Sequence, residues 1–174
     1  PVKNDVLIFE ELNERFTTSI GMTSDEKYFI IGSGDHTTSE VYYFPTHENN
    51  PKPRLFKKAK EGIIYSINSW NNDFYMHTND EAEDFKICKC KHNKINAWED
   101  VVPAKDEVLV GGFIMLNNWM IRSETLNALP KLFVRNLKDD TEEELIFSDE
   151  SVYSPEISLK QKDRNTDNIL ISYN

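Results

Sequence analysis

Short apolar runs, each closed by turn-forming residues, occupy most of the chain. The clearest pair lies within Gly62–Asn79, where Ile63–Trp70 and Phe74–Thr78 flank the polar segment Asn71–Asp73. Isoleucine and aromatic residues suit a pleated, half-buried surface, and asparagine tolerates the positive φ that hairpin turns need. We find no convincing stretch with apolar residues at i, i+3, i+4 and i+7. The pattern therefore predicts an all-β chain that contains this hairpin.

Similar apolar runs on both sides of the hairpin predict further strands. Those before it are Asp5–Glu10, Thr17–Thr23, Tyr28–Ile31, Ser39–Phe44 and Arg54–Lys58. Those after it are Phe85–Cys90, Trp98–Pro103, Glu107–Leu116, Trp119–Ser123, Lys131–Arg135, Glu144–Phe147, Val152–Leu159 and Asn168–Tyr173. The first of them has no obvious hairpin partner before it, and we expect Gly32–His36 to break the strand that begins at Tyr28.

The predicted strands recur at a nearly constant spacing. First strands of successive groups open near Gly62, Glu107 and Ser151, which gives offsets of 45 and 44 residues. Third strands near positions 41, 86 and 132 are 45 and 46 residues apart. A four-stranded unit with this period is typical of β-propeller blades, which repeat every ~40–50 residues. A β-sandwich also has evenly spaced short strands, but the measured period favours the propeller.

We therefore predict a partial β-propeller over residues 1–174, with about three complete four-stranded antiparallel blades and parts of two flanking blades. The predicted boundaries are a blade remnant at 1–15, blades at about 16–60, 61–105 and 106–149, and an incomplete blade at 150–174. Closed propellers have about 4–8 blades, so the chain is either a short arc or one part of a larger ring. Uncovered blade faces and strand edges would favour self-association.

The chain is acidic, with 30 Asp and Glu against 20 Lys and Arg and a formal net charge of −10. Binding nucleic acid without regard to sequence requires neutralising phosphates, so we expect no nucleic-acid partner. The acidic surplus suits a solvated surface, although it could also attract basic peptides. No apolar run approaches the ~20 residues of a membrane span and Pro1–Asn4 is no signal peptide, so we expect no membrane partner. The missing initial methionine suggests a piece of a longer chain.

Cys88 and Cys90 are the only cysteines. On a strand they would point to the same face, one pleat repeat apart, which is not the register of a bridging pair. Unpaired cysteines favour a cytoplasmic protein. Together with His77 or His92 they could suggest a metal site, but structural zinc takes four ligands, usually with cysteines two to four residues apart. A lone Cys-x-Cys is more often two packed or exposed thiols, so we assign no metal and no cofactor.

Several short sequence motifs occur along the chain in a defined order and spacing. They are Thr37–Val41, Tyr65–Ser66, Phe74–Tyr75, Asn79, Phe85, Trp98–Glu99, Pro103, Gly112–Phe113 and Trp119. In this order and spacing the chain resembles the propeller domain of oligopeptidase B, also called protease II, within the prolyl oligopeptidase family of serine peptidases. The resemblance extends over nearly the whole chain.

The resemblance implies a seven-bladed propeller that caps an α/β-hydrolase catalytic domain. In that family the propeller acts as a size filter, which admits short peptides and excludes folded proteins, and the peptidase cleaves after Arg or Lys. The present chain corresponds to the middle and later part of such a propeller. The acidic residues that bind the basic side chain of the substrate belong, in the family, to the catalytic domain.

The nucleophile of that family needs a Gly-x-Ser-x-Gly elbow on a strand-to-helix turn. The segment Gly32–Gly34 places its serine directly between glycines, and no helix follows. We interpret it as a hairpin turn, so no catalytic residue is carried over and no activity is expected of the chain alone. His36 and His47 lie in segments of loop composition, where we expect them to be solvated.

Arg122, Glu124 and Asn127 lie in or after the strand that begins at Trp119, ahead of a predicted long loop, Ser123–Pro130. Such connections reach one rim of a propeller, so an ion pair to a partner domain is possible, although a solvated loop is the preferred interpretation. The acidic run Asp139–Glu144 indicates a turn at the outer rim and an exposed strand edge, where charge discourages edge-to-edge pairing.

Three functional hypotheses follow. The first is a fragment of the substrate-gating propeller of an oligopeptidase B-like serine endopeptidase, with an α/β-hydrolase domain as its partner in the same or a separate chain. The second is a free-standing β-repeat interaction module, or the remnant of a split or decaying peptidase gene. The third, an independent hydrolase, is disfavoured because the chain lacks the elbow and its triad.

Overall fold

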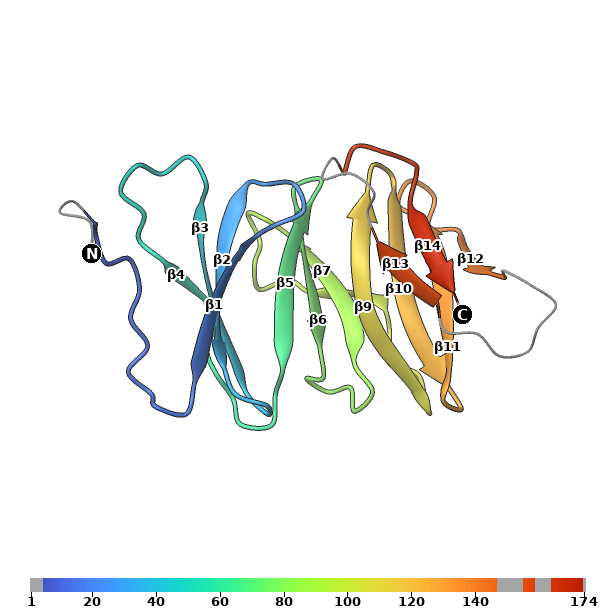
Figure 1. Cartoon of the computed structure of the whole chain (residues 1–174), viewed down its shortest axis with the longest axis horizontal. Helices are drawn as coiled ribbons and strands as arrows, with labels where there is room; N and C mark the ends of the chain where they lie inside the picture. Colours follow the sequence, from blue (N-terminus) through green and yellow to red (C-terminus); the bar gives the residue numbers. More distant parts are fainter. Residues whose placement is uncertain (1–4, 147–154, 159–163, 174) are drawn as a thin grey trace. The chain divides into compact units, whose positions relative to one another are not determined.

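Four groups of antiparallel strands make up the computed structural model, which describes residues 5–146, 155–158 and 164–173 (Figure 1). Three groups are four-stranded sheets in which each strand pairs with its neighbour in sequence, and the fourth is a pair of strands. Every regular element in the described residues is a strand. The prediction was an all-β chain with about three complete four-stranded antiparallel units and parts of two flanking ones. It is confirmed for the three complete units and for the C-terminal part.

Sheet 1 has the order β1-β2-β3-β4 and sheet 2 the order β5-β6-β7-β8. The strands of sheet 1 are β1 (Thr17–Met22), β2 (Tyr28–Gly34), β3 (Ser39–Pro45) and β4 (Arg54–Lys57). Those of sheet 2 are β5 (Tyr65–Trp70), β6 (Asp73–Thr78), β7 (Lys86–Lys91) and β8 (Glu99–Val102). The predicted turn of the opening hairpin is confirmed, because Asn71 and Asn72 have φ of 50° and 66° and connect β5 to β6. Two consecutive residues at positive φ form the tight turn that matches the twist of paired strands.

Sheet 3 has the order β9-β10-β11-β12, and a two-stranded sheet follows it. Its strands are β9 (Val108–Leu116), β10 (Trp119–Leu126), β11 (Leu129–Asn136) and β12 (Glu142–Leu145), and the last pair is β13 (Pro155–Ser158) with β14 (Leu170–Tyr173). Part of the predicted strand Val152–Leu159 lies outside the described residues.

By its internal contacts the chain divides into two compact units, and the division runs through sheet 2. Unit 1 comprises the described residues within 1–80 and 88–99, and unit 2 those within 81–87 and 100–174. In unit 1, residues of sheets 1 and 2 form a common core of Val41, Tyr65, Met76 and Cys88, with Ile30, Phe56, Ile67 and Trp98 packed against it. In unit 2 the fully buried apolar side chains include Val110, Met115, Leu116, Met120 and Leu132.

Three predicted elements are wrong. Asp5–Glu10 forms no strand, because no described segment pairs with it and an extended segment becomes a strand only through a neighbour's backbone. Gly32–Gly34 is not a turn, because β2 continues to Gly34 and the reversal occurs at Asp35–Thr38. The long loop at Ser123–Pro130 does not exist.

A two-residue turn replaces that loop. Asn127 and Ala128 have φ of 51° and 62°, so β10 reverses directly into β11. Asn127 is a turn-forming residue but Ala128 is not, so residue type alone did not predict a tight reversal here. The described part of the chain also contains no helix long and apolar enough to cross a membrane.

Candidate functional site

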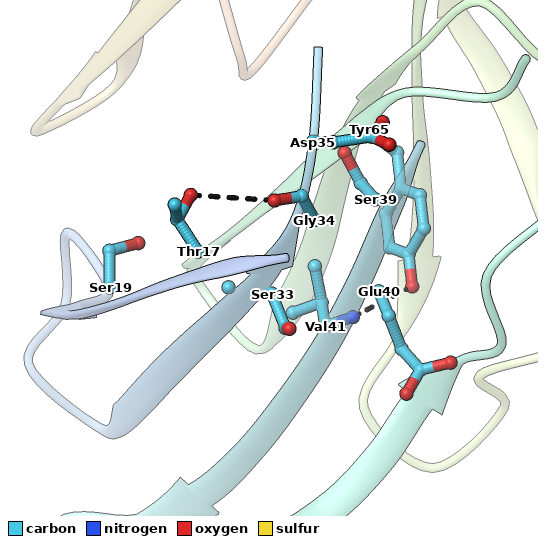
Figure 2. Close-up of a pocket in the computed structure, with 10 residues that line it drawn as sticks. Thr17, Ser19, Ser33, Gly34, Asp35, Ser39, Glu40, Val41 and Tyr65 are labelled. Atoms are coloured by element: carbon cyan, nitrogen blue, oxygen red, sulfur yellow. Dashed lines mark hydrogen bonds between the residues drawn. The ribbon is translucent and has the colours of Figure 1, made fainter. Parts of the chain in front are cut away.

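A trough crosses one face of sheet 1 (Figure 2). Two rows of the strand register form its floor: Thr17, Gly34 and Ser39 in one, and Ser19, Gly32 and Val41 in the other. Because residues two apart on a strand face the same side, the two glycines leave the middle strand without side chains between three hydroxyl residues and Val41 on its neighbours. The resulting cleft has a volume of about 220 Å³. Its lining is mainly hydroxyl groups and backbone.

The two glycines differ in what they permit. A Cβ at Gly34 would lie 2.2 Å from the backbone oxygen of Thr38, which belongs to the turn and cannot move without disturbing it. A Cβ at Gly32 would meet only the hydroxyl of Ser19, at 3.3 Å, and a rotation of that side chain relieves the contact. Gly34 is therefore required for the backbone, whereas Gly32 keeps the trough open.

Tyr65 of β5 forms one wall of the trough. Its hydroxyl accepts a hydrogen bond from the backbone N–H of Val41 at 3.0 Å and donates to the backbone oxygen of Lys57. Burial raises the pKa of Tyr65, so the phenol is neutral over the physiological range. Because both hydrogen-bond partners of the hydroxyl are backbone groups, the Tyr65 side chain is held in place as one side of the trough.

Asp35 lies at one end of the trough as an ionised carboxylate. Hydrogen bonds from the backbone N–H of Thr37 (2.9 Å) and from its hydroxyl, together with the Arg15 guanidinium at 2.8 Å, lower the pKa of Asp35. Ser33 donates to Glu11 and thereby lowers the pKa of that carboxyl as well. This end of sheet 1 is therefore acidic, and a cation of the chain is already paired with Asp35.

Unit 1 also brings a serine, a histidine and an aspartate together. The hydroxyl of Ser69 in β5 donates to Asp25 Oδ2 at 2.8 Å and lies 2.9 Å from His92 Nε2. The Nδ1 atom of His92 lies 3.4 Å from the hydroxyl of Tyr28. Desolvation lowers the pKa of His92, which keeps the imidazole neutral.

The hydrogen-bond directions show that this cluster is structural. The single hydroxyl proton of Ser69 goes to Asp25, so His92 Nε2 must carry a proton and donate to Ser69 Oγ. In a serine-peptidase triad the histidine instead accepts the proton of the serine. Ser69 is also fully buried, so no substrate can reach it. The cluster joins the β1–β2 turn to sheet 2 within unit 1.

A second buried cluster lies in sheet 3. The guanidinium of Arg122 in β10 is fully buried; its Nε and Nη2 donate to Glu124 at 2.9 and 2.7 Å, and it also pairs with Glu142 of β12. Lys105 donates to both carboxylate oxygens of Glu124, at 2.8 and 3.0 Å. The Arg122 guanidinium stacks over the ring of Phe133 in β11, 4.7 Å from its centroid. The cluster thus links three strands of one sheet.

The interpretation of Arg122 and Glu124 as solvated loop residues is wrong. Burial by itself would lower the pKa of Arg122, but the hydrogen bonds with Glu142 and Glu124 outweigh it and raise the pKa. The same pairing lowers the pKa of Glu142. Neither Arg122 nor Glu124 is accessible to a partner domain, and only Asn127 of that predicted group is exposed. Glu142–Glu144 of the acidic run belongs to β12.

The cysteines and histidines considered in the sequence as metal ligands do not come together in a metal site within the described residues. Cys88 and Cys90 are buried and are not joined in a disulfide, and burial raises the pKa of Cys90 to about 12, so it stays protonated. No group of three or more His, Cys, Asp or Glu residues suited to a metal ion occurs in the described ranges. His36 and His47 are exposed, as predicted, whereas His92 is half-buried in the serine cluster.

Sequence reasoning missed both the trough and the serine cluster. The alternating glycines at 32 and 34 were the available signal for the trough, since two glycines on one face of a strand leave a gap there. No local sequence pattern predicts the serine cluster, because Asp25, Ser69 and His92 are far apart in the chain.

Comparison with known proteins places the whole chain in one group. Residues 1–174 match the family described as "Prolyl oligopeptidase, N-terminal beta-propeller domain". "Protease 2" of Moraxella lacunata is 27% identical over 172 residues, covering 99% of this chain and 24% of that protein. "Dipeptidyl aminopeptidase BI" of Pseudoxanthomonas mexicana is 28% identical over 176 residues, again 99% of this chain and 24% of that protein.

The fold agrees with that match. The structure of oligopeptidase B from Trypanosoma brucei with covalently bound antipain superposes with a TM-score of 0.91 at 20% identity, covering 99% of this chain and 26% of that one. The chain therefore spans about a quarter of the length of the relatives it matches.

Proposed function

Because the chain belongs to the family of prolyl oligopeptidase N-terminal β-propeller domains, we propose that it helps to gate substrate entry to a serine peptidase that cleaves short peptides after Arg or Lys. The chain is the N-terminal propeller region of an oligopeptidase B-like or prolyl oligopeptidase-like peptidase. In this proposal its partner is an α/β-hydrolase catalytic domain, which supplies the nucleophile and the pocket for the basic side chain.

One observation carries the proposal: the match covers the entire chain but only about a quarter of each relative. The sequence has no Gly-x-Ser-x-Gly elbow. Ser69, whose hydroxyl lies 2.9 Å from His92 Nε2, donates to an aspartate and is buried. These features support a chain that shapes access to a catalyst and performs no chemistry itself.

The composition of the strands supports a gating role. The first strand of each four-stranded sheet, β1, β5 and β9, contains no Asp, Glu, Lys or Arg, whereas each fourth strand, β4, β8 and β12, contains two or more. The first strand of the two-stranded sheet, β13, contains Glu156. Propeller blades surround a central channel, and the first strand of a blade is the one beside it. An uncharged wall would admit peptides of varied sequence.

A chimera tests the proposal. The present chain would replace the matching 172 residues of protease 2 from Moraxella lacunata, and the chimera would be assayed with a short fluorogenic arginine peptide and with a folded protein. We expect cleavage of the peptide and exclusion of the folded protein. A chimera that is folded by circular dichroism yet cleaves the folded protein would overturn the gating role, and a folded but inactive chimera would overturn the equivalence of the two segments.

We also propose that the isolated chain self-associates, because the segment before β1 exposes large apolar side chains. Val6, Leu7 and Leu12 are 71%, 75% and 82% exposed. Apolar groups gathered on a surface favour association, and light scattering should show species larger than a monomer that diminish in the Leu7→Ser, Leu12→Ser variant. The absence of a disulfide at Cys88 and Cys90 supports a cytoplasmic location, which cell fractionation would test.

A further inference from the structure

We propose that the open edge of β1 binds an extended basic peptide as a fifth strand of sheet 1. The inference deepens the proposed function, on which it rests for the class of ligand, an oligopeptide. It assigns a binding surface in the propeller chain itself, separate from the catalytic domain. The surface consists of Thr17–Met22 with the trough on one of its faces.

The edge of β1 is open and lacks the usual protection. β1 is the terminal strand of sheet 1, and all six of its residues are exposed. Natural edge strands are normally protected from pairing by charges, proline or a bulge. The sequence Thr-Thr-Ser-Ile-Gly-Met contains no charge and no proline, and its register with β2 is unbroken. The other end of the same sheet, β4, carries Arg54 and Lys57.

The register identifies which backbone groups are available. Thr23 N–H donates to the oxygen of Tyr28 at 3.0 Å, and these two residues stand opposite each other in the continued β1–β2 register. Opposed residues of an antiparallel pair alternate between bonded and non-bonded positions. Gly21, Ser19 and Thr17 therefore direct their backbone groups toward β2. The N–H and C=O groups of Thr18, Ile20 and Met22 point to the open edge.

The two faces of the edge specify the pattern of the peptide. On one face an added strand would lie beside Thr17 and Ser19 and the hydroxyl-lined trough. On the other it would contact Ile20 and Met22, which are 64% and 55% exposed. Because side chains alternate along a strand, a peptide with apolar residues at every second position and small polar residues between them is complementary to both faces.

Carboxylates at both ends of the edge favour a basic peptide. Asp35 follows Gly34, the partner of Thr17 in the register, and Glu26 lies in the turn that follows Met22. Arg15 already pairs with Asp35, but its side chain is 70% exposed. Exposed ion pairs are weak, so an arginine of the peptide can share or replace this contact. The self-association proposed above involves Val6, Leu7 and Leu12, which precede β1, whereas the net charge of −10 opposes a second copy of the chain as the occupant of the β1 edge.

The probe is the peptide acetyl-Arg-Thr-Val-Thr-Val-Arg-amide, titrated into the full chain at a concentration where light scattering shows a monomer. Amide hydrogen exchange resolved by NMR should show slowed exchange at Thr18, Ile20 and Met22, and unchanged exchange at Ser19 and Gly21, which β2 already protects. A twin peptide N-methylated at alternate residues cannot donate to the edge, and we expect its affinity to fall by about tenfold or more.

Matched variants at one position separate backbone pairing from side-chain contact. Ile20→Pro removes an N–H that faces the open edge while the bonds to β2 remain, and it should abolish binding. Ile20→Thr keeps that N–H and should retain most of the affinity. Circular dichroism of both variants verifies the fold. A separate variant, Asp35→Asn, tests the contribution of charge. It should weaken binding of this probe more than binding of a probe whose terminal arginines are replaced by serine.

Several outcomes would overturn the inference. They are protection by the probe at sites away from β1, equal affinity of the N-methylated twin, equal binding by folded Ile20→Pro, and a dimer that pairs through β1. A failure here leaves the chimera assay unaffected, because that assay reads cleavage of a short peptide by the catalytic domain. Loss of chimera activity with intact edge binding would instead count against the proposed function alone.

Discussion

Each of the two units contains a buried polar cluster, and the two clusters differ in charge. In unit 1, Ser69 connects Asp25 to a neutral histidine, His92. In unit 2, Arg122 is placed between two carboxylates, Glu124 and Glu142. The first cluster contains an imidazole whose pKa is lowered by desolvation, and the second contains an arginine whose hydrogen bonds lower the pKa of Glu142. Similar burial therefore gives the two units different responses to mutation and to pH.

The largest effect should come from removing the cation of the charged cluster. Arg122→Met removes the fully buried cation from Glu124, which keeps the hydrogen bonds from the partly exposed Lys105, and we expect it to reduce the free energy of unfolding by about 3–5 kcal/mol. Urea denaturation gives this quantity. The double variant Arg122→Met, Glu124→Leu should recover part of the loss, because no carboxylate is then left buried; a double variant less stable than the single one would contradict this explanation.

The neutral cluster should respond less strongly. Ser69→Ala removes the donor to Asp25 and the acceptor for His92, and we expect a loss of about 1–3 kcal/mol in the same measurement. The matched control is Ser66→Ala, on the same strand but exposed, which should change stability by less than about 0.5 kcal/mol. Equal effects at the two serines would show that the hydrogen bonds of Ser69 contribute nothing.

The pH dependence should separate the units. The pKa of His92 is lowered from 6.5 in the folded state, so the unfolded chain binds the proton more readily and stability from this group falls as pH drops below about 6.5. The pKa of Glu142 is lowered from 4.5, so its stabilising contribution is present above about 4.5 and is lost as pH falls further. Hydrogen exchange, corrected for intrinsic rates, should lose protection first in unit 1.

A variant at His92 checks the assignment of the first pH step. His92→Gln keeps an amide near Ser69 but cannot titrate, so the loss of unit 1 protection below pH ~6.5 should disappear. Protection in unit 2 should be unchanged in this variant. A step that survives in His92→Gln would assign the titration to another group.

The smallest expected change in stability comes from substituting the glycines of the trough. Gly34→Ala forces a Cβ against the backbone oxygen of Thr38, whereas Gly32→Ala meets only a serine hydroxyl. We expect Gly34→Ala to lower the melting temperature and Gly32→Ala to change it little. Equal effects of the two substitutions would mean that the turn at Asp35–Thr38 adapts to a side chain.

The sequence was sufficient for the fold where the signals are local. The hairpin at Asn71–Asn72 and the spacing of the first and third strands depend on residue type and period alone, and both survive in the structure. The segment Asp5–Glu10 has the composition of a strand, but strand formation also depends on a neighbour that composition does not reveal. The turn at Ala128 was missed because its φ is imposed by the pairing of β10 with β11.

The polar clusters could not be predicted for a related reason. Arg122 and Glu142 lie on β10 and β12, with Phe133 of β11 between them, and only the register brings them together. A charged residue considered alone is usually solvated, which is why the sequence-based interpretation of Arg122 was wrong. Burial and pairing are properties of the assembled sheet, and they decide what these residues do.

The central claim is that this chain shapes access to a catalyst located elsewhere. The most direct measurement compares the purified chain with the protease 2 chimera in one fluorogenic arginine-peptide assay. We expect no turnover by the chain and clear turnover by the chimera. Turnover by the chain alone that disappears in Ser69→Ala would contradict the account, because it would make the buried serine cluster a working nucleophile.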